Sequence, residues 1–157
     1  MHCSEPIIAE ATSNSKMGTA NMDYLKQLEA DILAWPDVSV HAHRFGGKEF
    51  RFRKAEIGHV HRDGTVDIPF PRPVRDALIK EGHAVEHRWV PDSGWTTFKI
   101  RDEADIAHAK DLMRLSYLRY AVKTSSDPRH FLKQESETLH LGPRYISLLE
   151  TFAPRNV

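Results

Sequence analysis

Residues 55–70 constrain the fold of this chain more than any other stretch, because they carry the pattern of a β-hairpin. Polar and apolar side chains alternate from Glu56 to His61, the turn formers Asp63-Gly64 follow, and a second apolar run ends at Phe70. Side chains two residues apart in a strand point to the same face of a sheet. A two-residue turn at Asp63-Gly64 would place both His59 and His61 on one face with the apolar residues Ile57, Val66, Ile68 and Phe70.

This hairpin predicts two imidazoles set into an apolar wall, an arrangement typical of a small-molecule site. In regular strands, Glu56 and Asp67 would lie on the opposite face from the histidines. A bulge at Gly58 would instead turn Glu56 toward them, because glycine is common at bulges.

Two more elements are expected before this hairpin. The spacing of apolar residues predicts a helix from Asn21 to Trp35, which Pro36 ends. Residues 38–43 and 48–53 then alternate as two strands, joined by the three-residue loop Phe45-Gly46-Gly47. His41 and His43 would face outward with the arginines of the second strand.

The second half of the chain predicts one further hairpin and several helices. We expect a short helix over residues 72–81, strands over 85–90 and 95–100 that bring His87 near Phe98, and a long helix from the cap Asp102 to about Val122. Asp127-Pro128 predicts another helix start, and the apolar residues of 145–152 predict a last one. Hairpin-joined strands are antiparallel, so the fold class is α+β, an antiparallel sheet covered by helices with a helical C-terminal tail. We divide it into a disordered leader (1–20), an α+β domain (21–122) and a helical extension packed on that domain (123–157).

Composition narrows the classes of function. Lys plus Arg and Asp plus Glu both number 22, so no net field favours nucleic acid, and no apolar run is long enough to span a bilayer. The single cysteine, Cys3, excludes a disulfide scaffold and is consistent with a cytoplasmic setting. We therefore expect a small-molecule ligand and neither a membrane nor a nucleic acid as partner, and the oligomeric state stays open.

Three histidines are the main candidates for chemistry. His59, His61 and His87 fall on apolar strand faces by periodicity, and their imidazoles would converge if the two hairpins share one curved sheet. Neutral histidines suit proton abstraction from an acidic hydroxyl. The same three could hold zinc, copper or ferrous iron, or each could be a core histidine bonded to a backbone carbonyl. We place them in a substrate pocket with no metal, lined further by Glu56, Trp89, Trp95 and Phe98.

Several short motifs resemble the luciferase domain family, small bacterial proteins of mostly unknown role grouped with the fungal luciferases. Over residues 21–152 the likeness to the bacterial members rests on Trp35-Pro36-Asp37-Val38, Phe45-Gly46-Gly47-Lys48-Glu49-Phe50, residues 56–61, residues 66–71, Asp92-Ser93-Gly94-Trp95 and Leu115-Ser116-Tyr117-Leu118. The likeness to the fungal enzymes covers residues 54–122. It rests on Glu56, Ile57, His59, His61, His87, Trp95 and the helix that follows.

The resemblance implies a pocket for a flat phenolic or enolic molecule. Fungal luciferases add molecular oxygen to a hydroxylated styryl-pyrone and release carbon dioxide and light without a known cofactor. By that resemblance His59 or His61 would be the base that forms the enolate, and His87 would steady the developing anion. The expected activity is a cofactor-independent oxygenase with oxygen as co-substrate. A non-catalytic binding module and a histidine-ligated metalloprotein are the alternatives.

Overall fold

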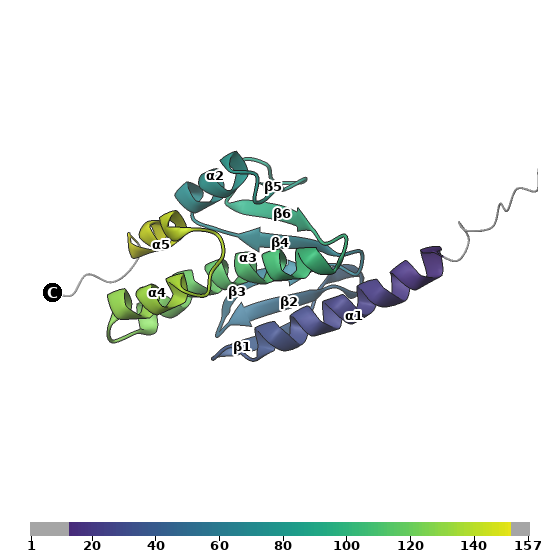
Figure 1. Ribbon diagram of the computed structural model, residues 1–157, viewed down its shortest axis with the longest axis horizontal. Helices are drawn as coiled ribbons and strands as arrows, with labels where there is room; N and C mark the ends of the chain where they lie inside the picture. The colour runs from purple at the N-terminus through teal and green to yellow at the C-terminus, as the bar shows by residue number, and fades with distance from the viewer. Residues whose placement is uncertain (1–12, 152–157) are drawn as a thin grey trace, which may run out of the picture.

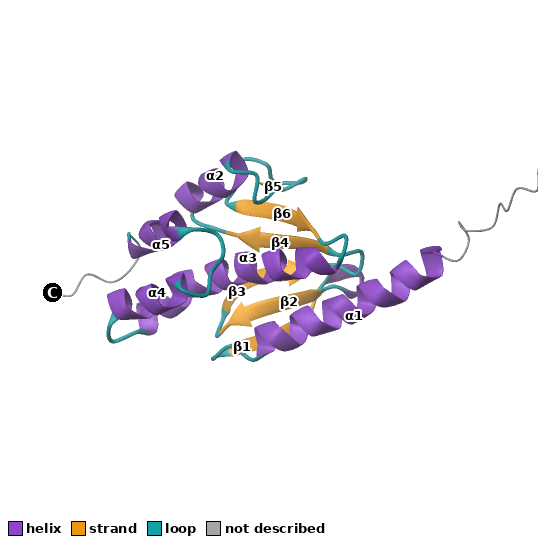
Figure 2. Cartoon of the chain, in the orientation of Figure 1, coloured by secondary structure: helices purple, strands orange, loops and turns teal. Residues whose placement is uncertain are grey.

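One antiparallel sheet and the helices that cover one of its faces make up the fold, which is α+β as predicted. The computed structural model describes residues 13–151, with the side chains of the first helix described from Asp23 onward. Figure 2 shows the strands as one layer behind the helices. The helices and strands are α1 (Ser13–Leu33), β1 (Val38–Ala42), β2 (Lys48–Phe52), β3 (Ala55–Val60), β4 (Thr65–Pro69), α2 (Arg72–Lys80), β5 (Val85–Glu86), β6 (Trp95–Lys99), α3 (Glu103–Ala121), α4 (Pro128–Ser136) and α5 (Pro143–Glu150).

The sheet has the strand order β1-β2-β3-β4-β6-β5, and every pairing is antiparallel. Helices α1 and α3 lie across the same face, α1 toward β1 and β2 and α3 over the middle strands (Figure 1). Helix α2 lies beside β5 and β6, and α5 packs against α2, α3 and α4. We call the face under α1 and α3 the core face.

Alternation along the strands explains which side chains enter the core. Phe50, Ile57, Val66 and Ile68 are almost completely buried on the core face, where they pack with Met113 and other apolar residues of α3. Burying a side chain of this size stabilises a fold by about 1.5 to 3 kcal/mol before the loss of chain entropy is counted. The sheet and α3 therefore form one continuous apolar core.

Most helix boundaries agree with the sequence. The side chain of Asp102 caps α3 by accepting from the backbone N–H of Asp105, and Asp127 caps α4 in the same way through His130. Helix α1 begins at Ser13, earlier than the predicted Asn21, and residues 1–12 of the predicted leader lie outside the described residues. Within the described part of the chain, no helix combines the length and apolar character that crossing a bilayer requires.

Two hairpins differ from their predicted registers. In the first, Val40 pairs with Phe50 and the loop is Arg44-Phe45-Gly46, a shift of two residues that leaves the faces unchanged. In the second, the loop is Arg62-Asp63-Gly64 with Gly64 at φ +88°, so His61 pairs with Thr65 through a backbone bond of 2.8 Å. A three-residue loop ending in a left-handed glycine is a common hairpin connection. Because this register differs by one residue from the predicted one, it reverses the faces of the returning strand.

Candidate active site

His59 and His61 do not lie in the apolar wall that the sequence predicted. In the observed register His59 pairs with Asp67 and Val60 with Val66, so the histidines point away from α3. Ile57, Val66, Ile68 and Phe70 face the core instead. We call the side that carries His43, His59, His61, Asp67 and Thr97 the histidine face.

A bulge in β3 explains why Ile57 and His59 point to opposite faces although they are two residues apart. The pairing with β2 shifts there, from Phe50 opposite Gly58 to Arg51 opposite Glu56. Gly58 has φ +154°, and a Cβ on it would lie 2.5 Å from the Sδ of Met113. The bulge brings Glu56 to the histidine face, which is the alternative that the sequence analysis gave for a bulge at Gly58. Glu56 Oε1 lies 2.7 Å from Nδ1 of His59.

Asp67 is the centre of the site, and its predicted place on the opposite face from the histidines is wrong. Its Oδ2 lies 2.8 Å from Nε2 of His61, 3.2 Å from Nε2 of His59 and 3.5 Å from Nε2 of His87. Its other oxygen accepts a hydrogen bond of 2.6 Å from the hydroxyl of Thr97. Asp67 is only 5% exposed, so this carboxylate relies on these partners for its charge.

His87 reaches the cluster by a different route from the one predicted. Strand β5 ends at Glu86, and Val85 pairs with Thr97, so His87 lies in the loop that follows rather than opposite Phe98. Its Nδ1 accepts a 3.2 Å hydrogen bond from the backbone N–H of Trp89. Phe98, predicted to line the pocket, is on the core face and contacts the ring of His108, with centroids 4.7 Å apart.

The two predicted tryptophans have different surroundings. The Trp95 ring lies 5.3 Å from that of His59 and 6.1 Å from that of His87, which places it inside the cluster. Trp89 is 76% exposed in the loop after His87. It lines a hollow of about 510 Å³ together with Phe45, His61, Arg62, Asp63, Thr65, Asp67, His87, Arg88 and Thr97.

His43 belongs to this cluster and was missed. Its ring stacks on His59 with centroids 3.9 Å apart, and its Nδ1 lies 3.6 Å from Glu49. The sequence places His43 on the outward face, but treating that face as plain solvent surface hid its contact with β3. No local sequence signal links His43 to His59, because their contact depends on how β1, β2 and β3 pair.

Neighbouring charges shift the titration of these groups. Burial opposes charging of His59, but hydrogen bonds to Asp67 and Glu56 outweigh it and raise the pKa of His59 to about 9. Burial likewise disfavours the Asp67 anion, yet hydrogen bonds from His59, Thr97 and His61 hold the pKa of Asp67 well below its usual range. Burial, followed by the nearby charge of His59, lowers the pKa of His43. Protons are therefore unequally distributed among close imidazoles, as acid–base centres require.

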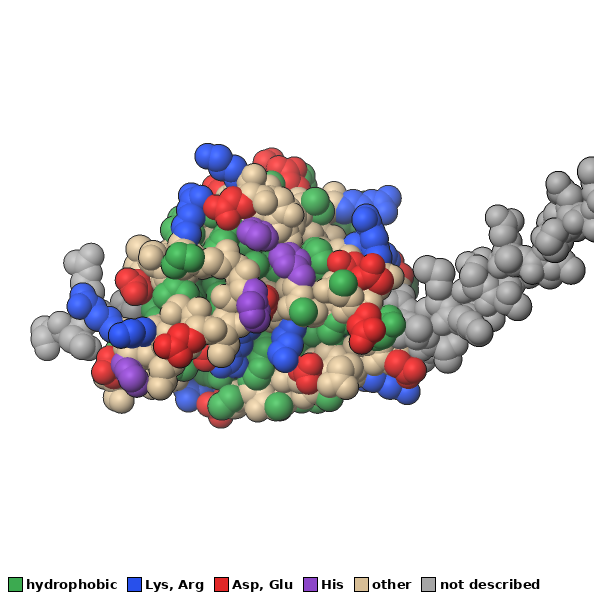
Figure 3. All heavy atoms as spheres, viewed as in Figure 1, with side chains coloured by type: hydrophobic (Ala, Val, Ile, Leu, Met, Phe, Trp, Pro, Cys, Tyr) green, Lys and Arg blue, Asp and Glu red, His purple; other side chains and the backbone are tan. Residues whose placement is uncertain are grey.

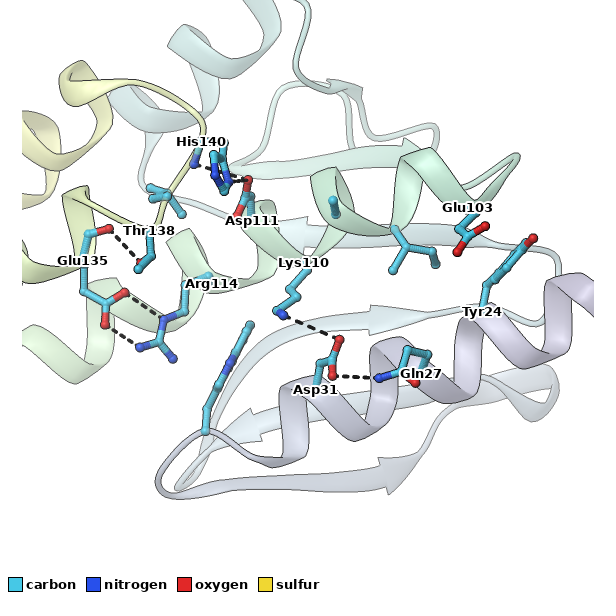
Figure 4. Close-up of a pocket in the computed structure, with 14 residues that line it drawn as sticks. Tyr24, Gln27, Asp31, Glu103, Lys110, Asp111, Arg114, Glu135, Thr138 and His140 are labelled. Carbon is cyan, nitrogen blue, oxygen red and sulfur yellow. Dashed lines mark hydrogen bonds and ion pairs between the residues drawn. The ribbon is translucent and has the colours of Figure 1, made fainter.

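A larger cavity of about 650 Å³ lies on the helical side, between α1, α3 and the segment that follows α4 (Figure 4). Its charged groups pair with one another, since Arg114 binds Glu135 through two nitrogens and Lys110 lies 3.6 Å from Asp31. The surface over the helices mixes acidic and basic side chains, with no large patch of one sign (Figure 3). The histidine face is the better candidate, because its polar groups converge on one atom.

Comparison with known proteins agrees with the part of the chain that holds this cluster. No curated protein and no solved structure gives a significant match. Residues 54–116 match the family model described as the luciferase domain, a span that contains Glu56, His59, His61, Asp67 and His87. Over these residues the chain resembles the luciferase domain family, as its sequence motifs predicted.

Proposed function

We propose that the histidine face carries the active centre of an oxygenase that acts on an enolisable, aromatic or pyrone-like small molecule. One observation carries the proposal: Asp67 Oδ2 lies within 3.5 Å of three imidazole nitrogens beside a hollow of about 510 Å³. That volume suits a small organic ligand. The luciferase-domain match supports the same class of substrate.

His61 is the proposed base. It lines the hollow, its side chain is 31% exposed, and its Nε2–H is oriented by Asp67 at 2.8 Å. Among the described residues, no hydrogen bond engages its Nδ1, which leaves that nitrogen to take a proton from a ligand hydroxyl. A carboxylate behind an imidazole fixes its tautomer and stabilises the imidazolium that forms.

The other residues have supporting roles in this scheme. His59 is held between two carboxylates and is 8% exposed, so it organises Asp67 rather than meeting the ligand. His87 lines the hollow and would donate to the developing enolate, while Trp89 and Phe45 would cover the flat faces of the ligand. The enolate itself supplies electrons to oxygen, so the reaction needs no organic cofactor.

Oxygen consumption with a panel of hydroxylated pyrones and phenols tests this function, with ligand affinity measured in parallel. We expect His61→Ala to lower kcat/KM by a factor of about 10² to 10⁴, the usual contribution of a positioned base, with a much smaller change in affinity. His41→Ala is the matched control, because His41 is exposed on β1 and bonds only Ser39 among the described residues. The proposal fails if His61→Ala changes neither turnover nor affinity. Tight binding without oxygen uptake would instead indicate a non-catalytic binding module.

A further inference from the structure

Three atoms of the cluster have the spacing of metal ligands. Nε2 of His59, Nε2 of His61 and Oδ2 of Asp67 all lie within 4.8 Å of one another, and Asp67 Oδ2 is 3.2 Å and 2.8 Å from the two nitrogens. Ligands about 2.0–2.2 Å from one ion are roughly 3 Å apart when the angle at the ion is near 90–110°. The two distances to Asp67 Oδ2 already match this spacing, and the two imidazoles would have to turn toward each other for all three atoms to share an ion.

In His59 and Asp67, the polar atom that would not bind the ion is hydrogen-bonded to a neighbouring side chain. Nδ1–H of His59 donates to Glu56 at 2.7 Å, which leaves Nε2 to serve as a ligand atom. The hydroxyl of Thr97 donates to Oδ1 of Asp67 at 2.6 Å, which leaves Oδ2. A carboxylate behind a ligating histidine and a donor behind a ligating carboxylate are the usual second layer of a metal site.

His87 is not part of the ligand set, although its Nε2 is 3.5 Å from Asp67. Its Nδ1 accepts the backbone N–H of Trp89, so the proton of a neutral His87 lies on Nε2. A protonated nitrogen cannot bind a cation. His87 therefore enters the site as a hydrogen-bond donor, near enough to Asp67 to share its proton between that carboxylate and a ligand oxygen.

The charge of the cluster also favours a cation. Among the described residues, the ion pairs of Glu56 and Asp67 involve histidines only, with no arginine or lysine. One buried carboxylate, Asp67, and one partly buried carboxylate, Glu56, therefore lack an arginine or lysine partner. A divalent ion would supply both charges at once.

We propose that His59, His61 and Asp67 bind one divalent transition-metal ion, with open coordination positions toward the hollow. Two imidazoles and one carboxylate suit zinc or iron better than magnesium or calcium, which prefer oxygen ligands. The inference goes beyond the proposed function, because the ion can bind whether or not the centre is catalytic. If an ion occupied Nε2 of His61, that imidazole would no longer act as the base. The ion would instead lower the pKa of a bound hydroxyl.

Calorimetric titration of chelator-treated protein with Zn²⁺, and with Co²⁺ followed by its visible spectrum, tests the site without any substrate. We expect one equivalent bound by the wild type, a loss of at least about 100-fold in affinity for His61→Ala, and a loss of about 10- to 100-fold for Glu56→Gln.

The control is His41→Gln, which removes a histidine from the same face outside the cluster and should leave affinity unchanged. Asp67→Asn tests the carboxylate ligand, provided that circular dichroism shows that the variant folds. If it does not fold, Glu56→Gln and Thr97→Val test the side chains that hold the ligands in place. The inference is overturned if the wild type binds less than about a tenth of an equivalent, or if His61→Ala and Glu56→Gln bind as the wild type does. Oxygen uptake by metal-free protein would leave the proposed function standing even then.

Discussion

The two hollows on opposite sides of the sheet differ in how their acids are balanced. In the helix-side cavity (Figure 4), Glu135 and Asp31 face Arg114 and Lys110, which are charged at every physiological pH. In the histidine-face hollow, the partners of Asp67 among residues 23–151 are imidazoles and a hydroxyl. Lysine and arginine therefore balance these two acids of the larger cavity, whose Asp111 pairs with the exposed His140. The balance at Asp67 instead depends on histidines and can change with a proton, a ligand or an ion. Volume alone would have selected the helix-side cavity.

The largest expected effect comes from Gly58, whose bulge creates the histidine face. Gly58→Ala should lower the free energy of unfolding by roughly 2 to 5 kcal/mol, because it combines a strained φ with a Cβ 2.5 Å from Met113 Sδ and 3.0 Å from the carbonyl of Asp67. Urea denaturation measures it. Gly142→Ala is the matched control, since Gly142 has φ +102° but open space around its Cβ position. Equal losses for the two variants would mean that the bulge is not tightly packed.

The next effect compares the acids of the two hollows directly. Asp67→Asn should cost about 3 kcal/mol in metal-free protein, since it leaves a buried cluster without its anion. Glu135→Gln should cost only about 1 kcal/mol, because Arg114 keeps its contacts with the rings of Trp35 and Tyr117. Thermal and urea unfolding at neutral pH check both. A larger loss for Glu135→Gln would reverse the comparison.

The two hollows should also differ in how they make the free energy of unfolding depend on pH. Because the pKa of His59 is about 9 in the fold and about 6.5 when unfolded, its charged form stabilises the fold fully below pH 6.5. That contribution is lost as pH rises through 9, and we expect metal-free protein to lose about 3 kcal/mol over this window. Denaturation between pH 6 and 10 measures the slope. His59→Gln should flatten it, whereas Glu135→Gln should leave it unchanged; a slope that survives in His59→Gln would assign it to another group.

Trp89 should give the smallest change in stability. It is 76% exposed, so Trp89→Ala should alter the free energy of unfolding by less than about 0.5 kcal/mol. If it covers the ligand, affinity for a hydroxylated pyrone should nevertheless fall about tenfold, as expected for the loss of one aromatic contact. Fluorescence titration of the variant measures this. Unchanged affinity would remove Trp89 from the binding surface.

The sequence predicted the elements of the fold better than the faces of its strands. Local signals such as the Asp102 and Asp127 caps located α3 and α4, because a cap depends on only a few neighbouring residues. Which side of the sheet His59 occupies depends on two local features, the bulge in β3 and the third residue of the turn. A two-residue and a three-residue turn are both compatible with Asp63-Gly64, and only the packing of Val60 and Val66 against the core chooses between them.

Site residues were therefore predicted in part. Glu56, His59, His61, His87 and Trp95 come together, although on the face opposite to the one expected for the histidines. Asp67 and His43 could be found only by placing β1, β3 and β4 in their true registers, which are tertiary information. Phe98 follows the alternation of β6 to the core, whereas Val85 pairs with Thr97 and β5 ends before His87, so the two predicted pocket residues lie apart.

The convergence of imidazoles on Asp67 is tested most directly by NMR titration of ¹⁵N-labelled histidines in metal-free protein. The structure predicts that His59 titrates with a pKa of about 9 and that Asp67→Asn lowers this pKa markedly. The ¹⁵N signals of His140, which lines the cavity on the helical side, serve as the control and should be the same in both proteins. A His59 that titrates at its ordinary value of about 6.5, unchanged by Asp67→Asn, would contradict the existence of the centre.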